Sequence, residues 1–164
     1  MPLFETAQHR EVEERIIRTA AEAFKCEAAP CSKAYCVDAV LFRNGRAVAF
    51  AEARQRKDKQ PKDEYGNPLK DELGNVVPAP LLSINKYNTL TWSAQKYVHA
   101  MQMTDLLPVA FCVEWLEGIH YMMIQRKPYS VGYMIPNKVR WEPDKEPVVH
   151  IPVSEFKLIA PREY

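Results

Sequence analysis

The chain has 164 residues, of which 47% are hydrophobic and 26% charged, and its formal net charge at pH 7 is +1. This length is typical of one domain with a substantial core, and we expect a single domain over residues 1–164. The small net charge excludes a strongly basic protein, so contact with nucleic acid would need local clusters of lysine and arginine. No apolar run approaches the ~20 residues of a membrane helix. An N-terminal secretion signal is also lacking, so we expect a cytoplasmic protein.

Residues 5–24 are predicted to form a helix with one buried face. The apolar residues at helical spacing are Val12, Ile16, Ile17, Ala20, Ala23 and Phe24. Extended toward the N-terminus, the same face passes through Glu13 and His9. Glu13 is either a functional acid at the end of the buried face or a residue whose stem packs while its carboxylate reaches water. His9 lies near the helix end and is expected to be exposed.

A connector over residues 25–34 is expected to lead into two strand-like apolar runs that flank a central Asn-Gly pair. Asp38 lies late in the first run, and Glu52 and Arg54 lie in the second. A charge inside a buried strand is costly unless it is paired or binds a metal. Two acids and a cation close together can share a divalent cation and a phosphate. The alternative is a half-exposed hairpin whose charges face water.

The turn between these runs decides whether the two acids share a face. A two-residue turn at Asn44-Gly45 pairs even with odd positions and places Asp38 and Glu52 on opposite faces. A three-residue loop from Arg43, with Gly45 left-handed in a bulge, places them on the same face. The sequence is compatible with both turns, and only the second assembles a site.

Residues 55–80 are predicted to form an exposed polar excursion that is mobile at its tip. They contain a repeat, KDEYGN from Lys62 and KDELGN from Lys70, and each copy ends in a turn-forming Gly-Asn pair. Four prolines in the same stretch discourage a long helix. A solvated loop is therefore expected unless a ligand orders it.

A second helix is predicted over residues 83–103, with Ser83 as its N-cap. Its expected buried seam comprises Ile84, Tyr87, Thr91, Ala94, Val98 and Met101. Lys86 falls in the first turn, where a cation opposes the helix dipole. This placement indicates a role for Lys86, and the alternative is a solvated lysine.

The rest of the chain is predicted to contain mainly strands. Residues 108–115 are apolar up to Glu114, as in a strand buried on both faces. Residues 119–125 return as another strand, and shorter strand-like fragments lie at 133–135 and 148–151. The cysteines lack the spacing of a zinc site, so we expect free thiols. They are Cys26, Cys31, Cys36 and Cys112.

Helix, hairpin, excursion, helix and hairpin follow one another in an α/β order with a mixed sheet. Over residues 5–126 this order resembles the PD-(D/E)xK nuclease superfamily. The matching residues are Asp38, Glu52, Ala53, Arg54 and Glu13. The resemblance implies a mixed central sheet flanked by helices, with a restriction-endonuclease-like αβββαβ core. It also implies a member from a phage or another mobile element.

The chain departs from the family pattern at two positions. Val37 precedes Asp38 where the family has proline, and Arg54 stands where the family has lysine. Arginine stays charged and cannot act as a base, although it can hold a phosphate or stabilise transition-state charge. We expect Lys86 to supply the missing ammonium from the second helix. The alternative is that the chemistry has been lost.

The resemblance implies a metal-dependent nuclease that hydrolyses phosphodiester bonds of DNA. Asp38, Glu52 and the backbone carbonyl of Ala53 would hold Mg²⁺ or Mn²⁺. Glu13 would hold a water or a second ion. Arg54, with Lys86, would contact the phosphate.

Other parts of the chain would contact partners. Arg56, Lys57 and Lys59 would guide the nucleic-acid backbone. The partners expected are nucleic acid, taken to be DNA, and a second copy of the chain. Two other interpretations stay open: a nuclease-like domain that binds nucleic acid or protein without cutting, and a phage structural or interaction protein that uses the excursion as its contact surface.

Overall fold

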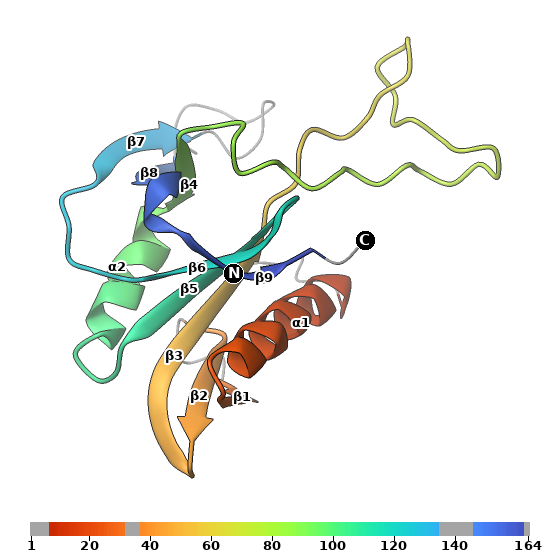
Figure 1. Ribbon diagram of the computed structural model, residues 1–164. Helices are drawn as coiled ribbons and strands as arrows, with labels where there is room; N and C mark the ends of the chain where they lie inside the picture. Colours follow the sequence, from red (N-terminus) through yellow and green to blue (C-terminus); the bar gives the residue numbers. More distant parts are fainter. Residues whose placement is uncertain (1–6, 32–36, 135–145, 163–164) are drawn as a thin grey trace.

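The computed structural model describes residues 7–31, 37–134 and 146–162 of the chain (Figure 1). In chain order the elements are α1 (Ala7–Ala23), β1 (Glu27–Pro30), β2 (Ala39–Arg43), β3 (Arg46–Gln55), β4 (Thr89–Ser93), α2 (Ala94–Met103), β5 (Val109–Trp115), β6 (Gly118–Met123), β7 (Ser130–Met134), β8 (Glu146–Pro152), the 3₁₀ turn η2 (Val153–Glu155) and β9 (Lys157–Pro161). In the described part of the chain, neither α-helix is long and apolar enough to cross a membrane.

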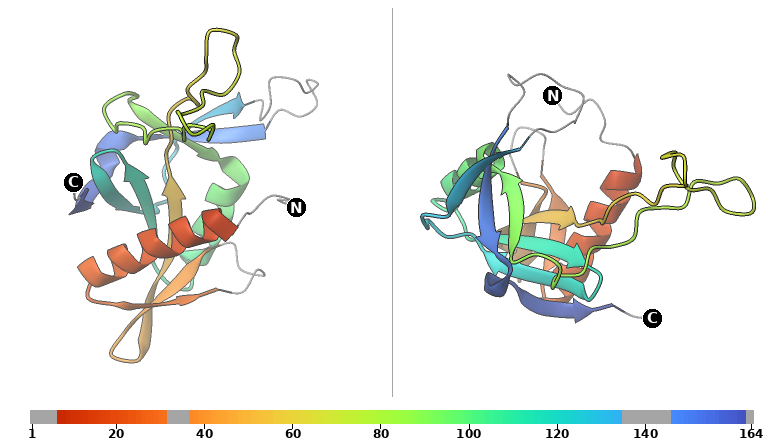
Figure 2. Two further views of the ribbon diagram at one scale, coloured as in Figure 1. Left: turned by 90° about the vertical axis from the view of Figure 1, so that its right-hand side faces the viewer. Right: turned by 90° about the horizontal axis from the view of Figure 1, so that it is seen from above.

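The strands form two sheets. The larger is a mixed sheet in the order β1-β2-β3-β5-β6-β9, in which only β3 and β5 run parallel. The smaller sheet has the order β4-β8-β7 and is antiparallel. Helix α1 covers one face of the large sheet, and α2 lies with the small sheet on the other face (Figure 2). The α/β class with a mixed sheet is therefore confirmed, whereas the small sheet was not expected.

The large sheet separates two hydrophobic clusters. Under α1 the sheet presents small side chains such as Ala51, Ala53 and Ala110, which let Ile16 and Ile17 approach the strands closely. The opposite face carries larger side chains that pack against the small sheet and α2. All seven residues of β5 are buried, so the predicted strand buried on both faces is confirmed.

The turn between β2 and β3 differs from the one that the site was expected to need. Asn44 and Gly45 both have positive φ, at 51° and 74°, and Arg43 pairs directly with Arg46. This is a two-residue turn of the type that asparagine and glycine favour. Of the two turns that the sequence allows, the two-residue turn is therefore the one that forms.

A β-bulge nevertheless restores the register that places the acids together. Phe42 pairs with Ala47 but Leu41 pairs with Ala49, so Val48 is the extra residue of β3. On the side of the bulge away from the turn, even-numbered residues of β2 pair with even-numbered residues of β3. Asp38 immediately precedes β2, so its expected position late in the strand is wrong.

One neighbouring expectation is also corrected, and another is confirmed. The connector predicted over residues 25–34 contains β1, which pairs antiparallel with β2 at the edge of the large sheet. Cys26, Cys31 and Cys112 carry free thiols, as expected. Cys36 lies outside the described residues.

The predicted helix over residues 83–103 begins eleven residues later, at Ala94. Its first half contains β4, in which Leu90 and Trp92 alternate into the core, because this stretch follows the two-residue period of a strand. Ser83 is not an N-cap, because the helix begins at Ala94 and Ser83 lies in the loop before β4, where its Oγ donates to the carboxylate of Glu117 and accepts from the N–H of Asn85. Two residues of the expected seam, Tyr87 and Val98, are exposed.

Residues 56–82, called the arm below, project from the body of the molecule beyond the end of β3 (Figures 1 and 2). None of residues 58–80 is buried, and none belongs to either hydrophobic cluster. The arm therefore contributes little to the hydrophobic stabilisation of the fold.

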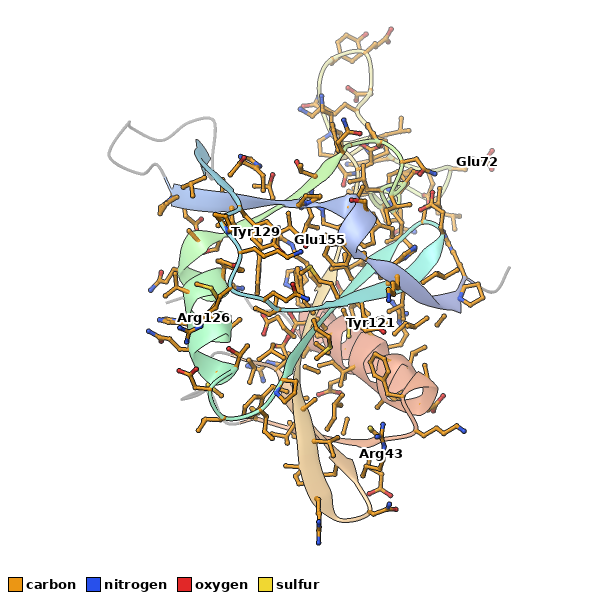
Figure 3. All side chains as sticks on the ribbon, turned by 60° about the vertical axis from the view of Figure 1, so that its left-hand side comes forward. Arg43, Glu72, Tyr121, Arg126, Tyr129 and Glu155 are labelled. Atoms are coloured by element: carbon orange, nitrogen blue, oxygen red, sulfur yellow. The ribbon has the colours of Figure 1, made fainter. Side chains whose placement is uncertain are left out.

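Proteolytic nicking of the arm is expected to leave the body folded. Cleavage after Glu64 or Glu72 by a glutamate-specific protease should change the free energy of unfolding by less than about 1 kcal/mol, as for surface changes away from a core. Glu72 lies on the arm, outside the body (Figure 3). The measurement is urea denaturation of the nicked and intact protein. Cooperative loss of structure on nicking would show that the arm belongs to the core.

Candidate active site

A cleft of about 530 Å³ lies between the beginning of α1, the end of β3, the beginning of α2 and the small sheet. Its charged lining residues are Glu13, Glu52, Glu146, Arg54, Lys57 and Lys96. His9 also lines it. Elements far apart in the chain thus bring both signs of charge to one hollow.

Asp38 is tied to both neighbours of Glu52. Its backbone N–H donates to the carbonyl of Ala51 at 3.1 Å. Its carboxylate oxygen Oδ2 accepts a hydrogen bond from the N–H of Ala53 at 2.8 Å. Asp38, just before β2, and Glu52, in β3, therefore lie close together, although only Glu52 is among the residues that line the cleft.

Glu52 is 7% exposed, and its Oε2 is buried without a hydrogen-bond partner among the described residues. Burial raises the pKa of Glu52 well above its ordinary value, and the charge of Asp38 raises it further. The ammonium of Lys96 acts in the opposite direction. The backbone N–H of Asp38 also lowers the pKa, but the net direction is upward, so an ionised Glu52 is only partly compensated and a bound cation would supply the rest.

The residue types of the acid pair fit a hard divalent cation, which takes oxygen ligands and often only one or two carboxylates. The open acceptor on Glu52 provides one such ligand. Within residues 7–31, 37–134 and 146–162, no group of three His, Cys, Asp or Glu side chains is arranged to hold a metal. The remaining ligands would have to come from the backbone, water or substrate.

Arg54 lines the same cleft two residues after Glu52. Burial lowers the pKa of Arg54 to about 10, with Arg56 acting in the same direction and Glu146 opposing it. Its guanidinium therefore stays charged at neutral pH. Arg54 is a fixed positive charge beside the acid pair.

Lys86 and Lys96 differ in position from what was expected. Lys86 lies in the loop before β4, and its ammonium bonds both carboxylate oxygens of Asp58, at 2.6 and 2.7 Å. It is not among the residues that line the cleft. Lys96, in the first turn of α2, does line it. The lysine nearest the acid pair on α2 is thus ten residues beyond the predicted one.

Some of the other predicted residues line the cleft and some do not. Glu13 lies where the extended face of α1 predicted, beside Glu52, whose pKa its charge raises. Lys57 lines the cleft, but Arg56 lines a separate small pocket and its Nε is buried without a partner among the described residues. Lys59 lies further along the arm and does not line the cleft.

The end of β3 is held by a contact that sequence reasoning missed. Arg15 of α1 donates to both carboxylate oxygens of Glu114 in β5, at 2.8 and 2.6 Å. Gln55 donates its Nε2 to the same carboxylate at 2.7 Å. Glu114, a lone charge ending an apolar run, was the available signal. This contact joins α1, β3 and β5 beside the cleft.

An acid pair on adjacent strands of a mixed sheet, flanked by cations, is typical of the PD-(D/E)xK class of proteins. Residues 1–159 match the model of a family described as "Phage putative PDDEXK endonuclease", and the chain belongs to that family. No curated protein and no solved structure matches the chain.

Proposed function

We propose that the protein is a metal-dependent nuclease that hydrolyses phosphodiester bonds of DNA in the cytoplasm. The carrying observation is the acid pair, in which Asp38 is bonded to both neighbours of Glu52 and Glu52 has a buried, unpartnered oxygen. Membership of the endonuclease family supports the same reaction. The inferred αβββαβ core consists of α1, β1–β3, α2 and β5, with β4 inserted before α2.

In this mechanism Asp38, Glu52 and the backbone carbonyl of Ala53 would hold Mg²⁺ or Mn²⁺. When bound, such an ion lowers the pKa of water and offsets charge that develops on the phosphate. Asp38 is held beside Glu52 by its hydrogen bonds to Ala51 and Ala53 of β3. Their negative charges are stabilised together only when a cation is present.

The cations and the third acid act on the substrate side of the cleft. Arg54 contributes a fixed charge that binds the scissile phosphate, and Lys96 donates hydrogen bonds to it as charge develops. Unlike arginine, lysine can also release a proton. Glu13 orients the attacking water from α1, and Lys57 binds a neighbouring phosphate.

The presence of arginine at position 54 supports a second candidate function, a domain that binds nucleic acid without cutting it. Arg54 stays charged at neutral pH, so it cannot serve as the proton acceptor that a lysine could be. In this alternative the cleft holds a phosphate, and Lys96 adds charge without taking part in a reaction.

The decisive test is cleavage of plasmid, linear duplex, branched DNA and RNA in Mg²⁺, Mn²⁺ or EDTA. We expect the wild type to cut DNA only with metal, and Asp38→Asn to cut at least about 100-fold more slowly. The wild type should also be stabilised against heat by metal, and the variant less so. Cleavage that survives in Asp38→Asn belongs to a contaminant. Metal-independent binding without cleavage would favour the second candidate.

A further inference from the structure

The arm is internally braced. Its two ends pair as a stem, in which Leu82 donates to the carbonyl of Arg56 at 2.9 Å and Asp58 donates to that of Pro80 at 2.8 Å. Further out, Leu69 donates to the carbonyl of Pro61 at 2.9 Å and Val77 to that of Leu69 at 2.8 Å. The arm then divides into two loops, as Figure 1 shows.

Each loop is one copy of the sequence repeat, and the two have the same geometry. Asp63 accepts hydrogen bonds from the N–H groups two and four residues ahead, both at 2.9 Å, and Asp71 does the same at the same distances. Gly66 and Gly74 have φ of 81° and 80°. The repeat therefore produces two equivalent turns with defined tips.

The repeat places an apolar side chain at the same position of each tip. Tyr65 is 80% exposed and Leu73 is 87% exposed, and neither belongs to a hydrophobic cluster. Such side chains gain nothing from the fold, and the repeat makes two of them available to a partner at equivalent positions of a projecting element. The lysine that opens each copy, Lys62 or Lys70, lies three residues before its tip.

The position of the arm identifies the partner. Its root follows Gln55 directly, and both Gln55 and Lys57 line the cleft, so nucleic acid held at Glu52 passes the stem. Lys57, Lys59 and the two repeat lysines are available for phosphate contacts along it. Glu64 and Glu72 disfavour a phosphate beside the tips, which leaves the bases as the groups that the tips can contact.

We propose that the arm is a second contact for the nucleic acid of the cleft, in which Tyr65 and Leu73 contact bases while the lysines bind phosphates. Aromatic and aliphatic side chains stack on bases or insert between them without sequence preference. This inference rests on the proposed function for its ligand. It adds the substrate feature that the arm recognises, which is accessible or unstacked bases.

The test compares wild type with Tyr65→Ser/Leu73→Ser, using fluorescein-labelled DNA in EDTA to prevent cleavage. The matched control is Val76→Ser, because Val76 is an apolar residue of the arm, 51% exposed, outside the tip positions. We expect the double variant to bind roughly tenfold more weakly or worse. The control should bind as the wild type does. The salt dependence should be the same for all three proteins, since no charge changes.

A second readout reports the bases directly. Wild type should change the fluorescence of 2-aminopurine at the contacted position, lowering it where Tyr65 stacks on the base and raising it where a side chain separates the base from its neighbour, and the double variant should not. Equal affinity and equal fluorescence for the double variant would overturn the inference, even if the wild type cleaves DNA. If the tips contact bases but the protein cleaves no DNA, the inference about the arm stands and the proposed nuclease activity is rejected. Failure to bind DNA, or tips that instead mediate self-association, would overturn it.

Discussion

Glu52→Gln is expected to lower cleavage about 10³-fold or more and, in EDTA, to raise the free energy of unfolding at neutral pH. Both effects have one cause. The carboxylate of Glu52 is buried, has an unpartnered oxygen and lies beside Asp38. Ionised and without a cation, it destabilises the fold by on the order of 2 kcal/mol. Glutamine removes that charge at nearly constant volume.

The gain in stability should depend on pH with a defined sign. The pKa of Glu52 is raised in the folded state, so over the window between its ordinary and raised values the native protein binds more protons than the unfolded chain. The stability of the wild type contributed by this group is therefore present below the ordinary pKa and lost as pH rises through the raised one. The glutamine variant lacks this loss, so the two proteins should converge in acid and diverge toward neutral pH.

Urea denaturation across pH, in EDTA and in Mn²⁺, measures this difference. Added metal should stabilise the wild type and leave the variant nearly unchanged. A variant that is less stable than the wild type at neutral pH would show that the protein itself already compensates the charge of Glu52. Cleavage by the variant at the wild-type rate would show that Glu52 takes no part in the reaction.

Lys96→Met is expected to lower the rate of cleavage by about 10²- to 10³-fold, the usual effect of removing one donor to developing charge. Lys96 lines the cleft from α2 and its charge acts on Glu52. Arg54→Lys should retain or raise activity, because it restores the residue type of the family, whereas Arg54→Ala should lose on the order of 3 kcal/mol of transition-state stabilisation.

The matched control for this series is Lys86→Met. Lys86 is bound to Asp58 and does not line the cleft, so its loss should leave the rate within about twofold, as expected for a surface ion pair. Single-turnover rates and DNA affinities should be measured for every variant. Loss of activity in Lys86→Met with none in Lys96→Met would reverse the assignment of the two lysines.

The acid pair could be predicted from sequence because charges that interrupt apolar runs are conspicuous. Asp38 and Glu52 were found in this way, although the sequence left the turn open between two types and gave no sign of the bulge at Val48, which brings the acids to one face. Lys96 was missed because the residues of the expected seam, five of them apolar, happen to follow helical spacing through a strand, at positions 84, 87, 91, 94, 98 and 101. Glu146 was beyond reach, since only pairing of β8 with β4 brings it to the cleft.

The bulge also determines which genetic changes the hairpin can accept. Because side chains alternate between faces, removing Val48 would turn every later residue of β3 over. Ala51 and Ala53 would then face the cleft, and Glu52 would lie beneath α1. Between the turn and Glu52, many residues can be substituted, but the deletion of a single residue would turn Glu52 to the other face of the sheet. In this hairpin, the number of residues between the turn and Glu52 constrains the site more tightly than the identity of those residues does.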